Sequence, residues 1–356
     1  MTLLKRATSL AAVAALAGLA ACSDSAGPEA VNPTDVAASV SDIAGDITSN
    51  AAFQSLAALK GATFTAAAAV RATLPLAMSG AVGTDRVGLA SSVAARRAAM
   101  TLLASRRSPG AAQALFPVLG KTFTWDAALD KYVVSAQTGA PADGDRFVLY
   151  TVDPATGKPN ENPLTPIGYV DLRDLSTPQA DIIGVVVKFG TQTVADYRIS
   201  AASSLTSISL SAVGYLAGVT GGNRVDFNLV TTLSLQGGAG QLDINYHIQG
   251  SNGGVIDILV SGSDAGVSIN VTVRHGSDNA VQLVGTGDSL TVNLQIKYNG
   301  TVVATITGSG DNPTFTGANG HTLTNPERVA LLGIFAQALA FADLLNGVFT
   351  PGLLIF

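Results

Sequence analysis

The sequence predicts an α+β protein in which a long, curved antiparallel β-meander wraps around an apolar C-terminal helix and Ala-rich N-terminal helices. Two observations predict this class. Between residues 181 and 308, apolar and polar residues alternate with a period of two, which gives each strand one buried and one solvated face, as is typical of antiparallel sheets. On both sides of this region the apolar residues change to helical spacing. We expect residues 34–356 to form one domain.

The first 22 residues have the organisation of an export signal. Lys5 and Arg6 precede an apolar run of small residues at positions 7–18, which is too short to span a bilayer. The run ends in Leu19-Ala20-Ala21-Cys22, which resembles the lipobox of bacterial lipoprotein precursors. The alternative interpretation is an ordinary cleaved signal followed by a chance cysteine.

The lipobox resemblance implies how the protein is processed and where it is located. Residues 1–21 would be the signal peptide, and Cys22 would carry the lipid and become the mature N-terminus. Ser23, rather than aspartate, follows the cysteine, so the resemblance implies an exported protein anchored to the bacterial cell envelope, at the outer membrane. The membrane is then a partner through the N-terminal lipid. Residues 22–33 are polar and contain two prolines, which predicts a flexible tether.

Cysteine content and charge exclude several functional classes. Cys22 is the only cysteine, so the mature chain has no thiol for a disulfide, a thiolate metal site or a cysteine nucleophile. Removal of residues 1–21 takes away two basic residues and no acidic one, which lowers the net charge from −5 to −7. An acidic chain without a basic cluster is not expected to bind nucleic acid, because neutralising phosphates requires clustered Lys and Arg.

Residues 34–115 are predicted to be a helical segment that packs on the sheet. The first helix places Val36, Val40, Ile43 and Ile47 at helical spacing, with Thr34 or Asp35 as its N-cap. Two further helices are expected at 51–77 and 85–107. Their basic residues are interpreted as a solvated helix face rather than a lipid-binding surface, and they are Arg96, Arg97, Arg106 and Arg107.

Residues 116–310 form the predicted antiparallel β region. The period of two begins at Phe123 and Trp125 and continues through the meander. Four of its central runs place these apolar residues on one face: Val225, Phe227, Leu229, Leu233, Leu235; Leu242, Ile244, Tyr246, Ile248; Val267, Ile269, Val271, Val273; and Leu290, Val292, Leu294, Ile296, Tyr298.

The turn at Asn299-Gly300 has a conflict of parity. Apolar residues occupy even positions before it (Leu294, Ile296, Tyr298) and again after it (Val302, Ala304, Ile306). A two-residue hairpin pairs even with odd positions and would place these two sets on opposite faces. We therefore expect a three-residue loop or a glycine bulge at this turn, with Gly300 at positive φ.

Residues 311–356 are predicted to be a loop followed by a buried C-terminal helix. Asn325 is the expected N-cap, followed by Pro326 and Glu327 in the first turn. Residues 328–346 are apolar almost all round, which indicates a helix that is either buried or in a membrane. Gln337 and Asp343 would be costly in a bilayer, so we expect the helix to be buried against the apolar face of the sheet.

The sequence carries no complete catalytic motif. The three histidines are His247, His275 and His321, and no nucleophile elbow, His-Glu-x-x-His pattern, phosphate loop or dinucleotide fingerprint accompanies them. His247 lies on the polar face of its strand, and His275 lies in a predicted turn. We expect no enzymatic activity, no catalytic residue and no cofactor.

Four turns of the meander carry an aspartate one or two residues after a glycine, at Asp264, Asp278, Asp288 and Asp311. Glycine-and-aspartate repeats can bind calcium when they recur strictly every nine residues. Here the spacing is irregular, and Asp and Gly are also the common residues of tight turns. The sequence therefore predicts hairpin turns and no metal site.

We expect a lipid-anchored, non-enzymatic cell-envelope protein that holds an apolar or lipid ligand between the sheet and the helices. The alternative is a structural or surface-interaction lipoprotein whose core is filled by its own side chains. In outline, the predicted architecture resembles bacterial lipoproteins and lipoprotein carriers in which helices close an open sheet. The polar sheet face lacks an aromatic platform for sugars, because Trp125, the only tryptophan, lies outside the meander. No particular protein partner or ligand residue is indicated.

Overall fold

A computed structural model describes eleven segments of the chain: residues 34–48, 119–153, 158–178, 180–218, 224–235, 240–263, 265–276, 279–288, 291–309, 314–319 and 322–349. These segments contain one 15-stranded sheet, two α-helices and a 3₁₀ turn. The predicted signal peptide, lipidated Cys22, tether, and helices at 51–77 and 85–107 lie outside the described residues.

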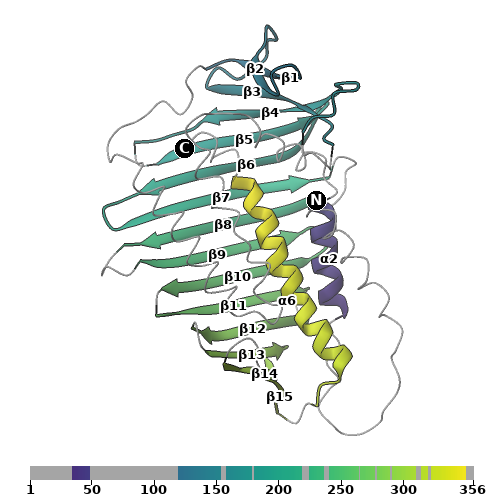
Figure 1. Ribbon diagram of the computed structural model, residues 1–356, viewed down its shortest axis with the longest axis vertical. Coiled ribbons are helices and arrows are strands. Elements are labelled where there is room, and N and C mark those ends of the chain that lie inside the picture. The colour runs from purple at the N-terminus through teal and green to yellow at the C-terminus, as the bar shows by residue number, and fades with distance from the viewer. Residues whose placement is uncertain are drawn as a thin grey trace.

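The strands follow one another through the sheet almost in chain order (Figure 1). Their bounds are β1 Thr122–Asp126, β2 Lys131–Val134, β3 Gly144–Tyr150, β4 Pro166–Asp174, β5 Asp181–Phe189, β6 Gln192–Ser203, β7 Ser207–Ala217, β8 Arg224–Ser234, β9 Gln241–Gly250, β10 Gly254–Ser263, β11 Gly266–His275, β12 Asn279–Gly287, β13 Thr291–Tyr298, β14 Thr301–Ser309 and β15 Thr314–Gly317.

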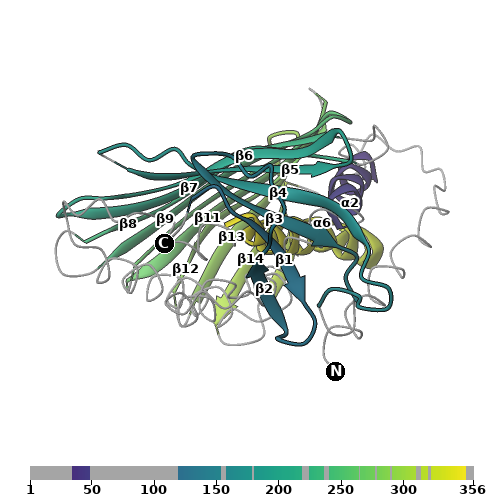
Figure 2. The same cartoon turned by 90° about the horizontal axis from the view of Figure 1, so that it is seen from above.

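The predicted antiparallel meander is confirmed from β3 to β15, where each strand pairs antiparallel with the next. The exception is at the other edge, where β1 lies between β2 and β3 and pairs parallel with β3. The sheet also runs past the predicted end at residue 310, because β15 adds a short final strand. Figure 2 shows how the strands fan out as the sheet twists.

Because apolar and polar residues alternate as predicted, apolar side chains of neighbouring strands lie directly beside one another. One cross-strand row runs from β6 to β13, and none of its members is more than 3% exposed: Ile199, Ala212, Leu229, Tyr246, Ile258, Val271, Leu283 and Ile296. Such directly opposed pairs stabilise a sheet on the face where they are buried. The main core of the protein is therefore a continuous layer along one face of the sheet, and Trp125, Val148 and Tyr150 form a separate, smaller buried cluster.

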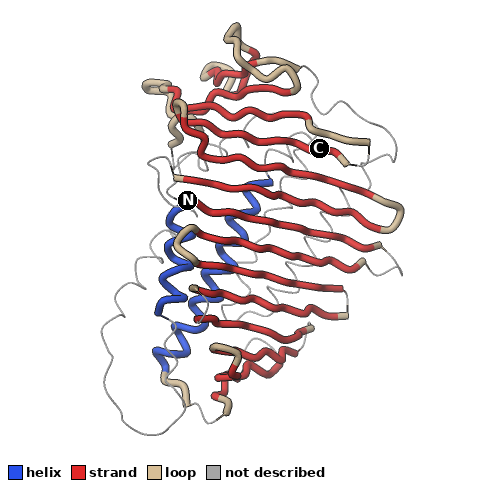
Figure 3. The backbone as a smooth tube through the Cα atoms, turned by 180° about the vertical axis from the view of Figure 1, so that it is seen from behind, coloured by secondary structure: helices blue, strands red, loops and turns tan. Residues whose placement is uncertain are grey.

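Both helices pack on that apolar face (Figures 1 and 3). The helix α2 (Thr34–Thr48) contacts α6 and the strands β10 and β11, and it buries Val36, Val40 and Ile43 to 1% exposure or less. This helix and its buried face agree with the prediction. Side chains at Gly250 and Gly254 would collide with Ile43, so these two glycines allow α2 to approach the β9–β10 hairpin closely.

The C-terminal helix α6 (Asn325–Leu345) is followed by the 3₁₀ turn η3 (Asn346–Phe349). Its four described residues with 1% exposure or less have the spacing of one helical face, and they are Leu331, Ile334, Phe335 and Ala338. Val329 is 62% exposed, so α6 is not buried all round, which corrects the expectation from its composition. Among the described residues, no helix has both the length and the apolarity to cross a membrane.

The N-terminus of α6 is closed by a capping box. The Thr324 backbone N–H donates to Glu327 Oε2 at 2.7 Å, and the Glu327 N–H points back to Thr324 Oγ1 at 3.5 Å. Thr324 is thus the N-cap, and the predicted cap, Asn325, is already the first helical residue. The prediction was wrong because the Thr-x-x-Glu pattern satisfies two backbone donors and outweighs the Asn-Pro signal.

For the Asn299-Gly300 turn, the expected positive φ of Gly300 is confirmed, and the expected loop or bulge at the turn itself is wrong. Gly300 has a positive φ of 82°, but Tyr298 pairs directly with Thr301 across a regular two-residue turn. The parity conflict is resolved inside β14, where a bulge leaves Val303 between two paired residues and turns its side chain into the core at 1% exposure. Val302 was therefore assigned to the wrong face.

The first prediction tests whether α6 belongs to the core. Phe335→Asp should lower the free energy of unfolding by ~3–5 kcal/mol or more, because it removes a buried aromatic and places an unpaired carboxylate there. Val329→Asp on the same helix should change it by only about 0.5 kcal/mol, because Val329 is exposed. Denaturant unfolding of the purified full-length protein measures both. Similar small losses in the two variants would show that α6 is peripheral.

Candidate functional site

The sheet face opposite the two helices is the open face, and no described helix covers it (Figure 3). Near one end of the strands it carries a row of polar side chains in cross-strand register. This polar row consists of one residue from each of seven consecutive strands, β8 to β14: Thr232, Asp243, Ser261, Ser268, Thr286, Asn293 and Thr307. Since neighbouring strands lie about 4.8 Å apart, the row presents hydrogen-bonding groups at a regular spacing.

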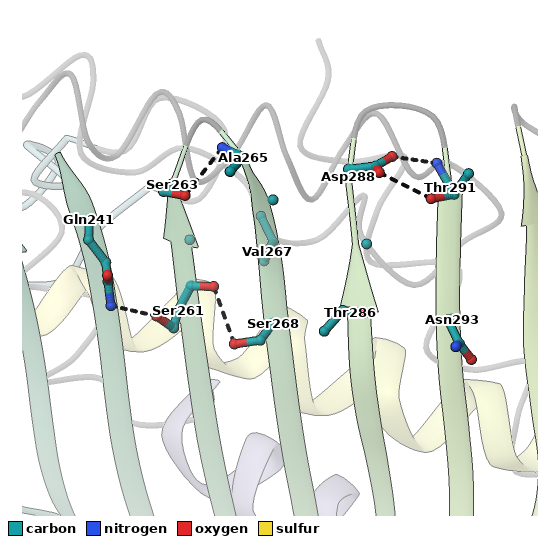
Figure 4. Close-up of a pocket in the computed structure, with 13 residues that line it drawn as sticks. Gln241, Ser261, Ser263, Ala265, Val267, Ser268, Thr286, Asp288, Thr291 and Asn293 are labelled. Carbon is teal, nitrogen blue, oxygen red and sulfur yellow. Dashed lines mark hydrogen bonds between the residues drawn. The ribbon is translucent and has the colours of Figure 1, made fainter. Parts of the chain in front are cut away.

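A groove of about 420 Å³ lies along the part of the polar row that belongs to β10–β13 (Figure 4). The groove is lined by Gln241, Ser261, Gly262, Ser263, Ala265, Gly266, Val267, Ser268, Thr286, Gly287, Asp288, Thr291 and Asn293. Gly266 pairs with Ser263, and its missing side chain leaves space beside Asp288, whose Cβ would lie 3.9 Å from a Cβ at that position.

Hydrogen bonds fix the two ends of the groove. At one end, Gln241 Nε2 donates to Ser261 Oγ at 3.0 Å, and Ser261 Oγ donates to Asp243 Oδ1 at 2.6 Å. At the other end, Asp288 accepts from the Thr291 N–H at 2.6 Å and from the Thr291 hydroxyl at 3.1 Å. The groove walls are therefore held in place by their own side chains before any ligand binds.

The lining residues are almost free of charge. Among the described residues that line the groove, Asp288 is the only ionisable side chain, and none is an aromatic, Lys or Arg side chain. The hydroxyl and amide groups can each donate or accept hydrogen bonds, whereas carboxylates only accept. This groove is suited to hydrogen bonding with a neutral polar group and not to an ionic one.

A second polar cluster lies on the open face, farther along the strands. His247 Nδ1 lies 2.6 Å from Asp257 Oδ1, and Arg274 donates to Asp257 Oδ2 at 2.7 Å. The His247 side chain is 46% exposed, which agrees with its predicted place on the wetted face. In the described part of the chain, no serine or threonine hydroxyl is bonded to His247.

The other predicted positions do not form a chemical site. His275 is the last residue of β11 rather than a turn residue, and its Nδ1 lies 2.5 Å from Oγ of the buried Ser39 on α2, so it joins helix to sheet. Asp288 closes its hairpin turn as predicted. Within the described segments, no group of three or more His, Cys, Asp or Glu residues could hold a metal ion. The remaining positions lie outside those segments, and they are Cys22, Asp264, Asp278, Asp311 and His321.

Sequence reasoning missed the groove. Its signal was present, because each strand from β9 to β13 carries polar residues at open-face positions, but alignment of these residues into a row depends on the register of each hairpin. Comparison with protein-family models, with curated proteins and with solved structures finds no match to this chain. The groove must therefore be interpreted from its own chemistry.

The second prediction tests whether the His247 cluster is an ordinary surface ion-pair network. Asp257→Ala should lower the free energy of unfolding by about 0.2–1 kcal/mol, because exposed pairs are screened by solvent. The loss should shrink at high salt, since salt weakens the interaction between charges. Denaturant unfolding at low and high ionic strength measures it, with Asn228→Ala on the same face as the uncharged control. A loss of several kcal/mol that does not depend on salt would contradict this view.

Proposed function

We propose that the protein is a lipid-anchored, non-enzymatic interaction protein of the bacterial cell envelope. In this proposal the sheet wraps its apolar face around the helices, the core is filled by the chain's own side chains, and the open face meets the binding partner. The observation that carries the proposal is the contrast between the two faces: one holds a continuous buried apolar row, and the other an aligned polar row with a preformed groove.

The buried face supports a core that the protein fills itself. The largest fully buried side chains include Tyr197, Tyr246 and Phe335, which come from distant strands and from α6. Protein interiors are packed about as densely as organic crystals, so a face with this burial has little space for another molecule. The groove formed by described residues lies on the opposite side of the sheet.

The location in the envelope rests on the lipobox. Cys22 follows a basic region and an apolar run in the order of a lipoprotein precursor. A lipid on Cys22 would hold the folded body at a membrane surface through residues 22–33. Many copies on one membrane would then present their open faces together, which raises the avidity for a repetitive partner.

The third prediction tests the anchor. Wild-type protein should partition into the detergent phase of a phase-separating detergent, because an acyl chain favours an apolar phase. Cys22→Ser should move it to the aqueous phase, whereas Ser23→Ala, beside the cysteine, should leave it with the detergent. Phase partition followed by immunoblotting of the two phases measures this. Equal partition of wild type and Cys22→Ser would remove the lipid anchor from the proposal.

A second candidate function, the holding of an apolar or lipid ligand between sheet and helices, is favoured by one observation. The Tyr197 hydroxyl is buried and has no hydrogen-bond partner among the described residues. Burial raises the pKa of this hydroxyl above its usual range, so it stays protonated and able to donate. The Tyr197 ring packs edge-on against the Phe227 ring, and the two ring centroids lie 5.7 Å apart. The rings occupy the space left by Gly214, which lies on the strand between them and pairs with both residues. A ligand with a carbonyl or ester oxygen could satisfy the hydroxyl.

The fourth prediction separates these two functions through Tyr197. With a core that the protein fills itself, Tyr197→Phe should keep or raise the free energy of unfolding by up to ~1 kcal/mol, because it removes an unsatisfied buried polar group. An organic extract of the native protein should then contain no stoichiometric lipid. A stoichiometric lipid by mass spectrometry, lost or depleted in Tyr197→Phe, would favour the ligand-holding function instead.

A further inference from the structure

We propose that the groove on the open face binds a neutral, linear carbohydrate chain. This inference rests on the proposed function, since it names the class of partner that the open face would meet. It also assigns a role to the polar lining residues, which lie outside the buried core.

The groove offers hydrogen-bonding groups that the protein does not use itself. Thr286 and Asn293 are exposed neighbours in the polar row, and neither side chain has a hydrogen-bond partner among the described residues. Ser268 and Ser261 lie beside them on β11 and β10, where Ser268 Oγ donates to the Ser261 carbonyl oxygen and Ser261 Oγ donates to Asp243, so these two hydroxyls offer a ligand only a lone pair. Sugar hydroxyls both donate and accept hydrogen bonds, so this mixture of hydroxyl and amide groups can pair with them in either direction.

The composition of the lining excludes other ligand classes. Nucleic acids and other polyanions need clustered cations, and the described lining contains no Lys or Arg. Protein interfaces are enriched in Tyr, Trp, Phe, Met and Arg, and none of these is among the lining residues that the structure describes. Apolar ligands need a predominantly hydrophobic pocket, but the largest aliphatic side chain among the described lining residues is that of Val267, which points into the core at 5% exposure. A neutral polyhydroxyl ligand remains.

The register of the sheet gives the groove a repeat. Ser261, Ser268, Thr286 and Asn293 are directly paired neighbours on four successive strands, so their side chains follow one another at the strand spacing of about 4.8 Å. This spacing is comparable to the length of one sugar unit in an extended chain. A linear glycan lying across the strands could therefore meet a hydroxyl or amide group at each successive unit.

The same chemistry predicts weak binding at a single site. The described lining has no aromatic platform, and the lack of such a platform was the reason that the sequence did not favour a sugar site. The structure supplies instead a preformed groove with an aligned polar row, and each neutral hydrogen bond contributes only modestly in water. Many membrane-anchored copies acting on one polysaccharide would compensate through effective concentration.

Affinity electrophoresis of the purified full-length protein tests the inference. Native gels in non-ionic detergent would contain dextran, laminarin, mannan or hydroxyethyl cellulose as neutral probes, and heparin as the charged probe. At least one neutral polysaccharide should slow the wild type in proportion to its concentration, and heparin should not. Thr286→Val and Asn293→Leu should each weaken the interaction about five- to tenfold, as expected for losing one hydrogen-bonding side chain.

Asn228→Leu provides the matched control, because Asn228 is an exposed asparagine on the same face but outside the groove. It should leave the retardation unchanged, and all three variants should keep the wild-type unfolding midpoint. The inference is overturned if no neutral polysaccharide slows the wild type, if heparin alone slows it, or if Asn228→Leu weakens binding as much as Asn293→Leu. None of these results would alter the partition of Cys22→Ser, so failure of the carbohydrate site is distinguishable from failure of the anchored function.

Discussion

Every turn of the meander must return the chain with its apolar residues on the same face of the sheet. A slip of one residue in any hairpin would carry a whole strand's apolar set into solvent. The consequence of keeping this parity is visible in the row that joins Ile199 on β6 to Ile296 on β13 without an exposed member. The core, the packing of both helices on the sheet and the composition of the open face all depend on this constraint.

Three two-residue turns show how the chain satisfies the constraint. Across the β10–β11 turn the apolar positions change from even to odd, and the ladder continues without a shift. Across the β5–β6 and β13–β14 turns they keep the same parity, and a bulge at the third residue of the second strand restores the alignment. The extra residue is Val194 in one case and Val303 in the other, and each is buried. Parity and turn length together therefore determine where a bulge is required.

The features that depend on local periodicity could be predicted from the sequence, and those that depend on contacts between distant residues could not. The alternation from residue 181 onward and the spacing of Val36, Val40 and Ile43 predicted the meander and α2. The contact between Ser39 and His275 joins residues 236 positions apart, and no local pattern signals it. The groove was missed for the same reason, because polar residues of separate strands form a site only after the hairpins fix their register.

The constraint also bears on where function can lie in this protein. The apolar face is committed to stability, because its residues pack against neighbouring strands and against α2 and α6. The open face carries no such requirement, since solvated positions of a sheet tolerate many residue types. Polar residues nevertheless fill seven consecutive positions of one row, from Thr232 to Thr307. Their alignment follows from the same strand register that aligns the apolar residues on the other face. A face that folding leaves free, with groups in a regular array, is the part of this molecule best placed to recognise a repeating partner.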